Sequence, residues 1–254
     1  MYGVCMKNII KKIFSKLNVD TYQRLLAYSI LRNHFNSLSS CPIYTKREVL
    51  WDSVIKSYIK DNDRIIYIEF GVHKGYSLNY IAKINTNEES IFIGLDSFEG
   101  LPEDWGTIMK KGTFNTDGRI PSTDDSRVSY IKGWFQNTWE DLEKKLLSIG
   151  NIENFVVHYD ADLYSSTLFA LSKIDTLKKT YIAIFDEFTG HETRALFNYC
   201  EAYSAKVDFL GQTIDYNYPC QVVCRITPIS KNIKHLDRGL TEMECTPVCG
   251  VEPG

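Results

Sequence analysis

Two apolar segments with the composition of buried strands, residues 155–159 and 181–185, are each followed by two acidic residues. Residues 167–179 between them have the length and composition of a crossover helix. A strand, a helix and a second parallel strand bring both strand ends to the same edge of a sheet. Open α/β sheets bind ligands at that edge, so we expect four carboxylates to converge there. The four residues are Asp160, Asp162, Asp186 and Glu187.

Carboxylates that lie together repel one another, because each raises the cost of ionising its neighbours. A bound divalent cation relieves this repulsion, and Mg²⁺ prefers such oxygen ligands. The alternative is that these acids only cap helices or end strands. Two acidic pairs after two buried strands favour the cation, so we predict a Mg²⁺ site at this edge.

A glycine-containing turn follows another apolar segment, residues 65–70, and leads into an expected helix at residues 78–84. Gly71 and Gly75 in this turn would let a ligand approach bare backbone at a helix N-terminus. The spacing is GxxxG, which differs from the dinucleotide-binding pattern GxGxxG. Ser77 either contacts the ligand or only caps the helix.

The next expected strand, residues 90–95, ends at Asp96. An acidic residue about 20–25 positions after a glycine turn is suited to accept hydrogen bonds from ribose hydroxyls. Ser97 and Phe98 follow, and the Phe98 ring either covers an adenine face or packs in the core. These features indicate a site for a nucleoside beside the glycine turn.

Strand-like and helix-like segments alternate along most of the chain. A further strand, residues 127–132, ends at Gly133 and Trp134, and residues 207–211 and 221–226 form a closing antiparallel pair. This order predicts an α/β fold with a Rossmann-like, seven-stranded, mostly parallel sheet and helices on both faces. The predicted units are an N-terminal helical extension (1–60), the main domain (61–229) and a loosely ordered tail (230–254).

The composition and charge argue against nucleic-acid binding and a membrane span, and they indicate a cellular compartment. A formal net charge of -3 over 254 residues gives no electrostatic case for binding nucleic acid. The sequence has no apolar run of about 18 residues and no signal-peptide core, so we expect no transmembrane helix. Seven scattered cysteines indicate reduced thiols and therefore a cytoplasmic protein.

Two further segments concern possible partners. The basic amphipathic segment at residues 7–17 either contacts an anionic membrane surface weakly or packs on its own domain or on a partner, and N-terminal helices of this kind are compatible with a homodimer. Residues 105–126 contain three glycines and a proline with little periodicity. A long irregular segment in a compact domain is often a functional lid, so we predict a lid over the substrate.

Five motifs, in the order IEFGVHKGYS, GLDSFEGLPEDW, IKGWFQNTW, DADLYSST and FDEF, resemble those of class I S-adenosylmethionine-dependent methyltransferases of the macrocin O-methyltransferase family. The resemblance covers about residues 64–226. It implies a metal-dependent enzyme that transfers a methyl group to a sugar hydroxyl.

The resemblance also implies roles for individual residues. Glu187 stands where many members have Asp, so its longer arm reaches the metal directly or through water. The base is left open between Asp162 and His191, because Thr189 occupies the place of a histidine that some members use. The metal candidates are Asp160, Asp186 and Glu187; the cofactor-binding candidates are Glu69, Gly71, Gly75, Ser77, Asp96, Ser97, Gly133 and Trp134.

Methyl transfer from a sulfonium donor to a hydroxyl requires close alignment and a group that takes the hydroxyl proton. A Mg²⁺ ion gripping adjacent hydroxyls would orient them and lower the pKa of one of them. We therefore predict an S-adenosylmethionine- and Mg²⁺-dependent O-methyltransferase acting on a small-molecule or glycan acceptor. The competing hypotheses are a nucleotide-sugar or NAD-type enzyme on a Rossmann-like sheet and a non-catalytic binding module.

Overall fold

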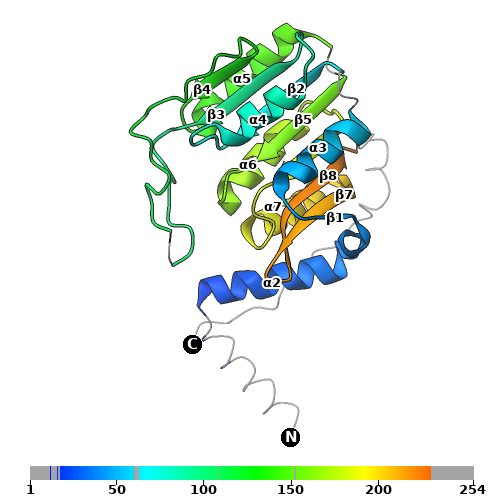
Figure 1. Cartoon of the computed structure of the whole chain (residues 1–254). Coiled ribbons are helices and arrows are strands. Elements are labelled where there is room, and N and C mark those ends of the chain that lie inside the picture. Colours follow the sequence, from blue (N-terminus) through cyan, green and yellow to red (C-terminus); the bar gives the residue numbers. More distant parts are fainter. Residues whose placement is uncertain are drawn as a thin grey trace, which may run out of the picture.

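The computed structural model describes residues 12, 16, 18–59, 63–107, 109–151 and 153–229. Within these residues the strands form one eight-stranded sheet in the order β1-β7-β8-β6-β5-β2-β3-β4 (Figure 1). β8 pairs antiparallel with β6 and β7, and the other described pairs are parallel. The strands are β1 (Ile43–Tyr44), β2 (Ile65–Phe70), β3 (Ile91–Asp96), β4 (Val128–Lys132), β5 (Asn154–Tyr159), β6 (Tyr181–Phe185), β7 (Lys206–Asp215) and β8 (Tyr218–Thr227).

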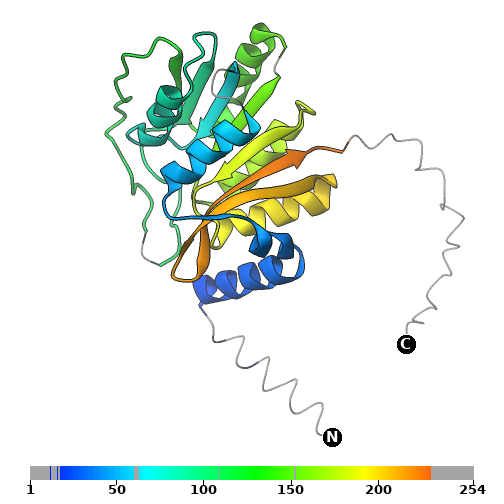
Figure 2. The same ribbon diagram turned by 45° about the vertical axis from the view of Figure 1, so that its right-hand side comes forward.

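Helices cover both faces of the sheet (Figures 1 and 2). Helices α3 and α4 lie on one face, and α5, α6 and α7 lie on the other, with α2 packed against α7. The described helices are α2 (Val19–Asn33), the short 3₁₀ helix η1 (Asn36–Ser40), α3 (Arg47–Tyr58), α4 (Tyr76–Ile84), α5 (Phe135–Ile149), α6 (Tyr164–Asp175) and α7 (His191–Tyr203). The predicted mostly parallel α/β fold is confirmed.

Strand β2 explains why the central strands are apolar throughout. Ile66, Ile68 and Phe70 pack into one apolar cluster with residues of α5, α6 and α7. Ile65 and Tyr67 point the other way, into a second cluster with residues of α3 and α4. Successive side chains of a strand alternate between faces, so a strand covered on both faces needs apolar residues at nearly every position.

The sheet has one strand more than the seven that the sequence predicts. The additional strand β1 has two residues and pairs parallel with β7, where Ile43 lies opposite Gln212. Two residues are too few to produce an alternating pattern, so β1 depends on its neighbour rather than on local composition. Both β1 and α3 fall within the predicted extension 1–60, and α3 contributes buried residues to the core.

Two element boundaries also differ from the sequence prediction. The closing strands β7 and β8 are each ten residues long, with a register shift near Gly211. The polar residues before Trp139 predict that Asn137 or Thr138 caps helix α5. This prediction is wrong, because the helix begins at Phe135 and Trp134 is its N-cap. The Thr138 hydroxyl instead donates to the carbonyl of Trp134, within the first turn of the helix.

The predicted helix at residues 7–17 and the predicted tail at 230–254 fall outside the described residues, apart from isolated positions 12 and 16. Among the residues described, no helix is both long enough and apolar enough to cross a membrane.

Candidate functional site

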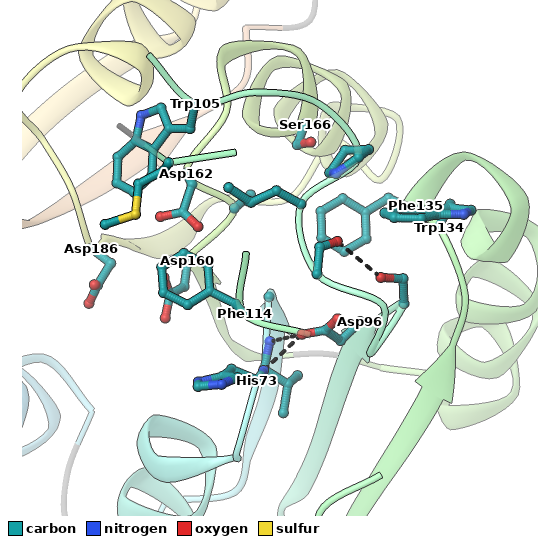
Figure 3. Close-up of a pocket in the computed structure, with 18 of the residues that line it drawn as sticks. His73, Asp96, Trp105, Phe114, Trp134, Phe135, Asp160, Asp162, Ser166 and Asp186 are labelled. Carbon is teal, nitrogen blue, oxygen red and sulfur yellow. Dashed lines mark hydrogen bonds between the residues drawn. The ribbon is translucent and has the colours of Figure 1, made fainter. Parts of the chain in front are cut away.

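A cavity of about 410 Å³ lies at the carboxyl ends of β2, β3, β5 and β6 (Figure 3). All four acids that the sequence places after β5 and β6 line it: Asp160, Asp162, Asp186 and Glu187. The glycine turn after β2, the end of β3 and the start of α5 complete its walls. The segment between β3 and β4 contributes Leu101, Pro102, Trp105, Met109 and Phe114.

Asp96, at the end of β3, holds the glycine turn in place. Its Oδ2 accepts hydrogen bonds from the backbone N–H groups of Val72 and His73, both at 2.8 Å. Its Oδ1 accepts from the backbone N–H of Phe98 at 2.7 Å. A carboxylate oxygen can accept two hydrogen bonds, so Oδ1 keeps acceptor capacity for a hydroxyl in the cavity. The carboxylate therefore shapes the turn and also faces the site.

Gly71 permits the ends of β2 and β5 to approach closely. A Cβ atom at this position would lie 1.8 Å from the carbonyl oxygen of Asp160, and the backbone φ is +94°. A residue with a side chain fits neither the space nor the conformation. Gly71 thus sets the distance between the glycine turn and the first acid.

Four residues at or beside the cavity adopt left-handed backbone conformations without being glycine. They are His73 (φ +49°), Phe98 (φ +59°), Phe114 (φ +68°) and Asp162 (φ +57°). Such conformations cost energy and tend to cluster at functional sites. At Asp162 the turn separates its carboxylate from that of Asp160, and the two point in different directions in Figure 3.

Asp160 and Asp186 come together with His158, which is not among the site residues predicted from the sequence. Ligand atoms of His158, Asp160 and Asp186 all lie within 4.8 Å of one another. His158 precedes Asp160 by two positions in and after β5, so both side chains project from the same face of the strand. The alternation of a strand places His158 on that face, but its position inside an apolar segment gives no sign of a ligand.

Glu187 is not part of this compact group of ligand atoms. It lines the cavity and lies half-buried beside a second cavity that Asp162 also lines. The sequence-based assignment of Glu187 as a metal ligand stays a prediction, and direct coordination would require its side chain to turn toward Asp186.

Burial and neighbouring charges shift the pKa values of the residues in this cluster. Burial, and then the neighbouring Asp186 carboxylate, raise the pKa of Asp160 well above its ordinary value. Burial, with Asp186 and Glu187, raises the pKa of Asp162 to about 7. Burial lowers the pKa of His158, but the Asp186 and Glu69 carboxylates outweigh it and raise that pKa to about 10. The site therefore attracts positive charge.

Protein groups already supply part of that charge around Asp186. The Arg47 guanidinium lies 3.6 Å from Asp186 Oδ1, and the Gln221 side-chain amide donates a hydrogen bond to the same oxygen. His158 Nε2 is 3.8 Å from it, which is an ion-pair contact rather than a hydrogen bond.

Two of the predicted cofactor-binding residues lie below the cavity rather than in its wall. Glu69 is fully buried and accepts hydrogen bonds from the hydroxyls of Tyr67 at 2.6 Å and Ser77 at 2.8 Å. The Tyr67 hydroxyl is also 2.8 Å from His158 Nδ1. Glu69 therefore connects through Tyr67 to the acid cluster.

The remaining predicted cofactor residues divide into two groups. Asp96, Ser97 and Trp134 line the cavity with Gly71. Gly75 is the N-cap of α4, and Gly133 donates its backbone N–H to the Asp96 carbonyl, so both support the walls from outside.

A second cavity of about 290 Å³ adjoins the first and shares four lining residues with it: Trp105, Met109, Asp162 and Glu187. Its other walls come from α2, through Gln23 and Arg24, and from the segment before α7. His191 lines this second cavity, and its Nδ1 accepts a hydrogen bond from the backbone N–H of Tyr164 at 3.2 Å. The two predicted bases therefore occupy different positions: Asp162 lines both cavities, whereas His191 lines the second cavity.

No protein-family profile and no curated protein matches this sequence. Among solved structures, the chain is similar to an O-methyltransferase from Bacillus cereus in complex with SAH, with 12% identity, a TM-score of 0.47, and coverage of 87% of this chain and 97% of that one. It is also similar to fibrillarin from Aeropyrum pernix with natively bound S-adenosyl-L-methionine, with 11% identity, a TM-score of 0.41, and coverage of 71% and 75%.

A protein from Corynebacterium glutamicum matches with 12% identity, a TM-score of 0.42, and coverage of 90% of this chain and 99% of that one. Likenesses at these values carry no argument about the activity of this chain. The α/β fold rests on its own strand order, and the activity must be argued from the site.

Proposed function

We propose that this chain is an S-adenosylmethionine-dependent O-methyltransferase that uses a divalent cation to act on a hydroxyl of a sugar, glycan or secondary metabolite. One observation carries the proposal. Four carboxylates and a glycine turn held by Asp96 surround a single cavity, and this cavity adjoins a second one large enough for part of an acceptor.

The first cavity suits the donor. S-adenosylmethionine, when bound, supplies a methyl group activated by a sulfonium charge. The bare backbone at Gly71 offers close approach, Asp96 Oδ1 retains acceptor capacity for ribose hydroxyls, and the Trp134 and Phe135 rings give the opposite wall (Figure 3). The nearby carboxylates favour a cationic group in this cavity.

Asp160 and Asp186 are the residues that would hold a divalent cation. Their half-buried carboxylates provide the hard oxygen ligands that such an ion requires, and burial together with the neighbouring Asp186 carboxylate raises the pKa of Asp160. The bound ion would orient the acceptor hydroxyl and lower its pKa.

Asp162 is the residue that we assign as the general base, because its carboxylate lines both cavities and so lies between donor and acceptor. His191 is less suited to this role in the arrangement described. Its Nδ1 accepts from a backbone N–H, which only donates, so the neutral ring carries its proton on Nε2. Neither nitrogen then offers a lone pair for the hydroxyl proton.

The direct test is turnover of isotopically labelled donor with a panel of nucleotide sugars and glycans, with and without chelator. Asp160→Asn should abolish cation-dependent transfer and leave the affinity for S-adenosylhomocysteine within a few-fold. Asp141→Asn, at an exposed position of α5, is the matched control and should behave as the unmodified protein.

Three outcomes would overturn parts of the proposal. Activity that chelator does not reduce would reject the cation. Loss of S-adenosylhomocysteine binding in Asp160→Asn would place Asp160 in the donor pocket instead. Calorimetric binding of NAD⁺ in place of S-adenosylhomocysteine would reject methyl transfer and favour a nucleotide-dependent enzyme on the same sheet.

A further inference from the structure

We propose that His158 Nε2 is a third ligand beside Asp160 and Asp186, so that the site prefers a divalent ion of the first transition row, such as Mn²⁺ or Co²⁺, over Mg²⁺. The role of that ion in catalysis rests on the proposed function, but its binding can be tested without any methyl transfer.

The first argument concerns the proton on the histidine ring. The Tyr67 hydroxyl has one proton and two neighbours, Glu69 Oε2 at 2.6 Å and His158 Nδ1 at 2.8 Å. The Glu69 carboxylate only accepts, so Tyr67 donates to Glu69. Tyr67 must then accept from Nδ1–H of His158. In the neutral ring this leaves the lone pair on Nε2, which faces Asp186.

This arrangement is the one in which histidines bind metals. A metal-binding histidine commonly donates its other ring N–H to an acceptor that fixes the tautomer and the ring orientation. Here that acceptor is Tyr67, and Tyr67 is held in turn by Glu69, which also accepts from Ser77. The hydrogen bond to Tyr67 at Nδ1 therefore fixes the orientation of the imidazole, and Nε2 on the other side of the ring is directed toward the two carboxylates.

The second argument concerns the burial of Nε2. His158 is 0% exposed, and its Nε2 has no hydrogen-bond partner among the described residues. Buried polar atoms without partners are rare and costly, so each one requires an explanation. A metal ion within reach of Nε2, Asp160 and Asp186 provides one.

The competing explanation is a protonated His158 that pairs with Asp186 and with Glu69, whose Oε2 lies 3.4 Å from Nδ1. A cation bound to Asp160 and Asp186 would neutralise the carboxylates that favour this proton, and metal binding to an imidazole displaces the proton from the ligating nitrogen. Asp186 Oδ1 already receives the Gln221 amide and lies near the Arg47 guanidinium, so it does not depend on an imidazolium for compensation. The 3.8 Å separation from Nε2 is also too long for a hydrogen bond.

The identity of the ion follows from the donor set. Mg²⁺ is bound almost entirely by oxygen and retains several waters, and an imidazole nitrogen adds little for it. Imidazole and carboxylate together suit the first-row transition ions, whose affinities increase from Mn²⁺ toward Cu²⁺. Replacing one oxygen ligand by Nε2 therefore shifts the preference of this site away from Mg²⁺.

The experiment uses the full-length protein after chelator treatment and desalting. Titration calorimetry with Mg²⁺, Mn²⁺ and Co²⁺ measures the affinities directly. We expect Mn²⁺ and Co²⁺ to bind at least about 10-fold more tightly than Mg²⁺, and His158→Asn to lose at least about 10-fold in Co²⁺ affinity. His158→Gln, whose side-chain oxygen reaches the place of Nε2, should shift the preference back toward Mg²⁺. His34→Asn, at an exposed histidine at the end of α2, is the control and should leave all three affinities unchanged.

A measurement on the unmodified protein keeps the test valid if the variants fail to fold. Pulsed electron paramagnetic resonance of bound Mn²⁺ should show the coupling of a directly bound imidazole nitrogen. Binding of Mn²⁺ without that coupling, or equal affinities for Mg²⁺ and Mn²⁺, would overturn the assignment of His158 and leave the proposed methyltransferase intact. Failure of both Mn²⁺ and Co²⁺ to bind would also overturn the assignment of His158 as a metal ligand. Tight Mn²⁺ binding with the nitrogen coupling, in a protein that transfers no methyl group, would uphold the site and reject the proposed function.

Discussion

Substitution of Gly71 by alanine tests how the ends of β2 and β5 position the cluster. The added Cβ would lie 1.8 Å from the Asp160 carbonyl oxygen, and contacts below 3.0 Å essentially never occur. The two strand ends must therefore separate by about 1.2 Å, the difference between these distances. The carbonyl belongs to the residue that we assign as a metal ligand, so the displacement acts directly on the site.

The expected loss of stability has two parts. A non-glycine residue with left-handed φ costs about 1–2 kcal/mol. Forced displacement of packed backbone costs about a further 1–3 kcal/mol. The sum of about 2–5 kcal/mol is below the stability of many domains, so we expect Gly71→Ala to fold but to unfold at lower urea concentration.

Gly112→Ala provides the matched control. Gly112 has a similar φ of +84°, but a Cβ there would meet nothing within 4 Å. It should therefore show only the backbone cost of about 1–2 kcal/mol. The difference between the two variants in urea-induced unfolding isolates the overlap with Asp160. The affinity for S-adenosylhomocysteine and for Mn²⁺ should fall in Gly71→Ala alone.

The reasoning is refuted if Gly71→Ala is no less stable than Gly112→Ala and retains both affinities. That result would mean that the strand ends separate freely, and that the spacing between the glycine turn and Asp160 is not fixed by contact.

Arg127→Gln should lower the free energy of unfolding by about 2–4 kcal/mol, because this guanidinium, with its side chain 17% exposed, donates to three backbone carbonyls near the end of α4 and to Asp125. Arg119→Gln, at a side chain that is 82% exposed, should change it by less than about 0.5 kcal/mol in the same urea titration. Asp162→Asn should lower kcat by about 10²–10⁴-fold if this carboxylate takes the proton. His191→Gln should lower kcat by less than about 10-fold, and equal losses in the two variants would contradict the assignment of Asp162.

The sequence predicts the framework of the site because local rules determine it. Strand β6 has the predicted limits, Tyr181–Phe185, since a short apolar run between polar segments can form little else in a sheet covered on both faces. Parallel topology then brings Asp160 and Asp186 to one edge whatever the details of packing. The glycine turn and Asp96 follow from the same rule.

Contacts between distant segments could not be predicted in this way. Strand β1 exists only because it pairs with β7, which follows it by more than 160 residues. The orientation of Asp96 toward the turn depends on loop backbone angles, including left-handed residues that no composition rule assigns.

The amino-acid sequence by itself determined the alternation of strands and helices, and therefore which acids meet at which edge, because periodicity and strand direction are local properties. Only the tertiary structure decided that His158 lies beside Asp160 and Asp186 while Glu187 stays outside this compact group, and that Glu69 is connected to it through Tyr67. The physical reason is register. Which side chains from separate strands share one space depends on how those strands are aligned, and a shift by one residue would turn each of them to the opposite face.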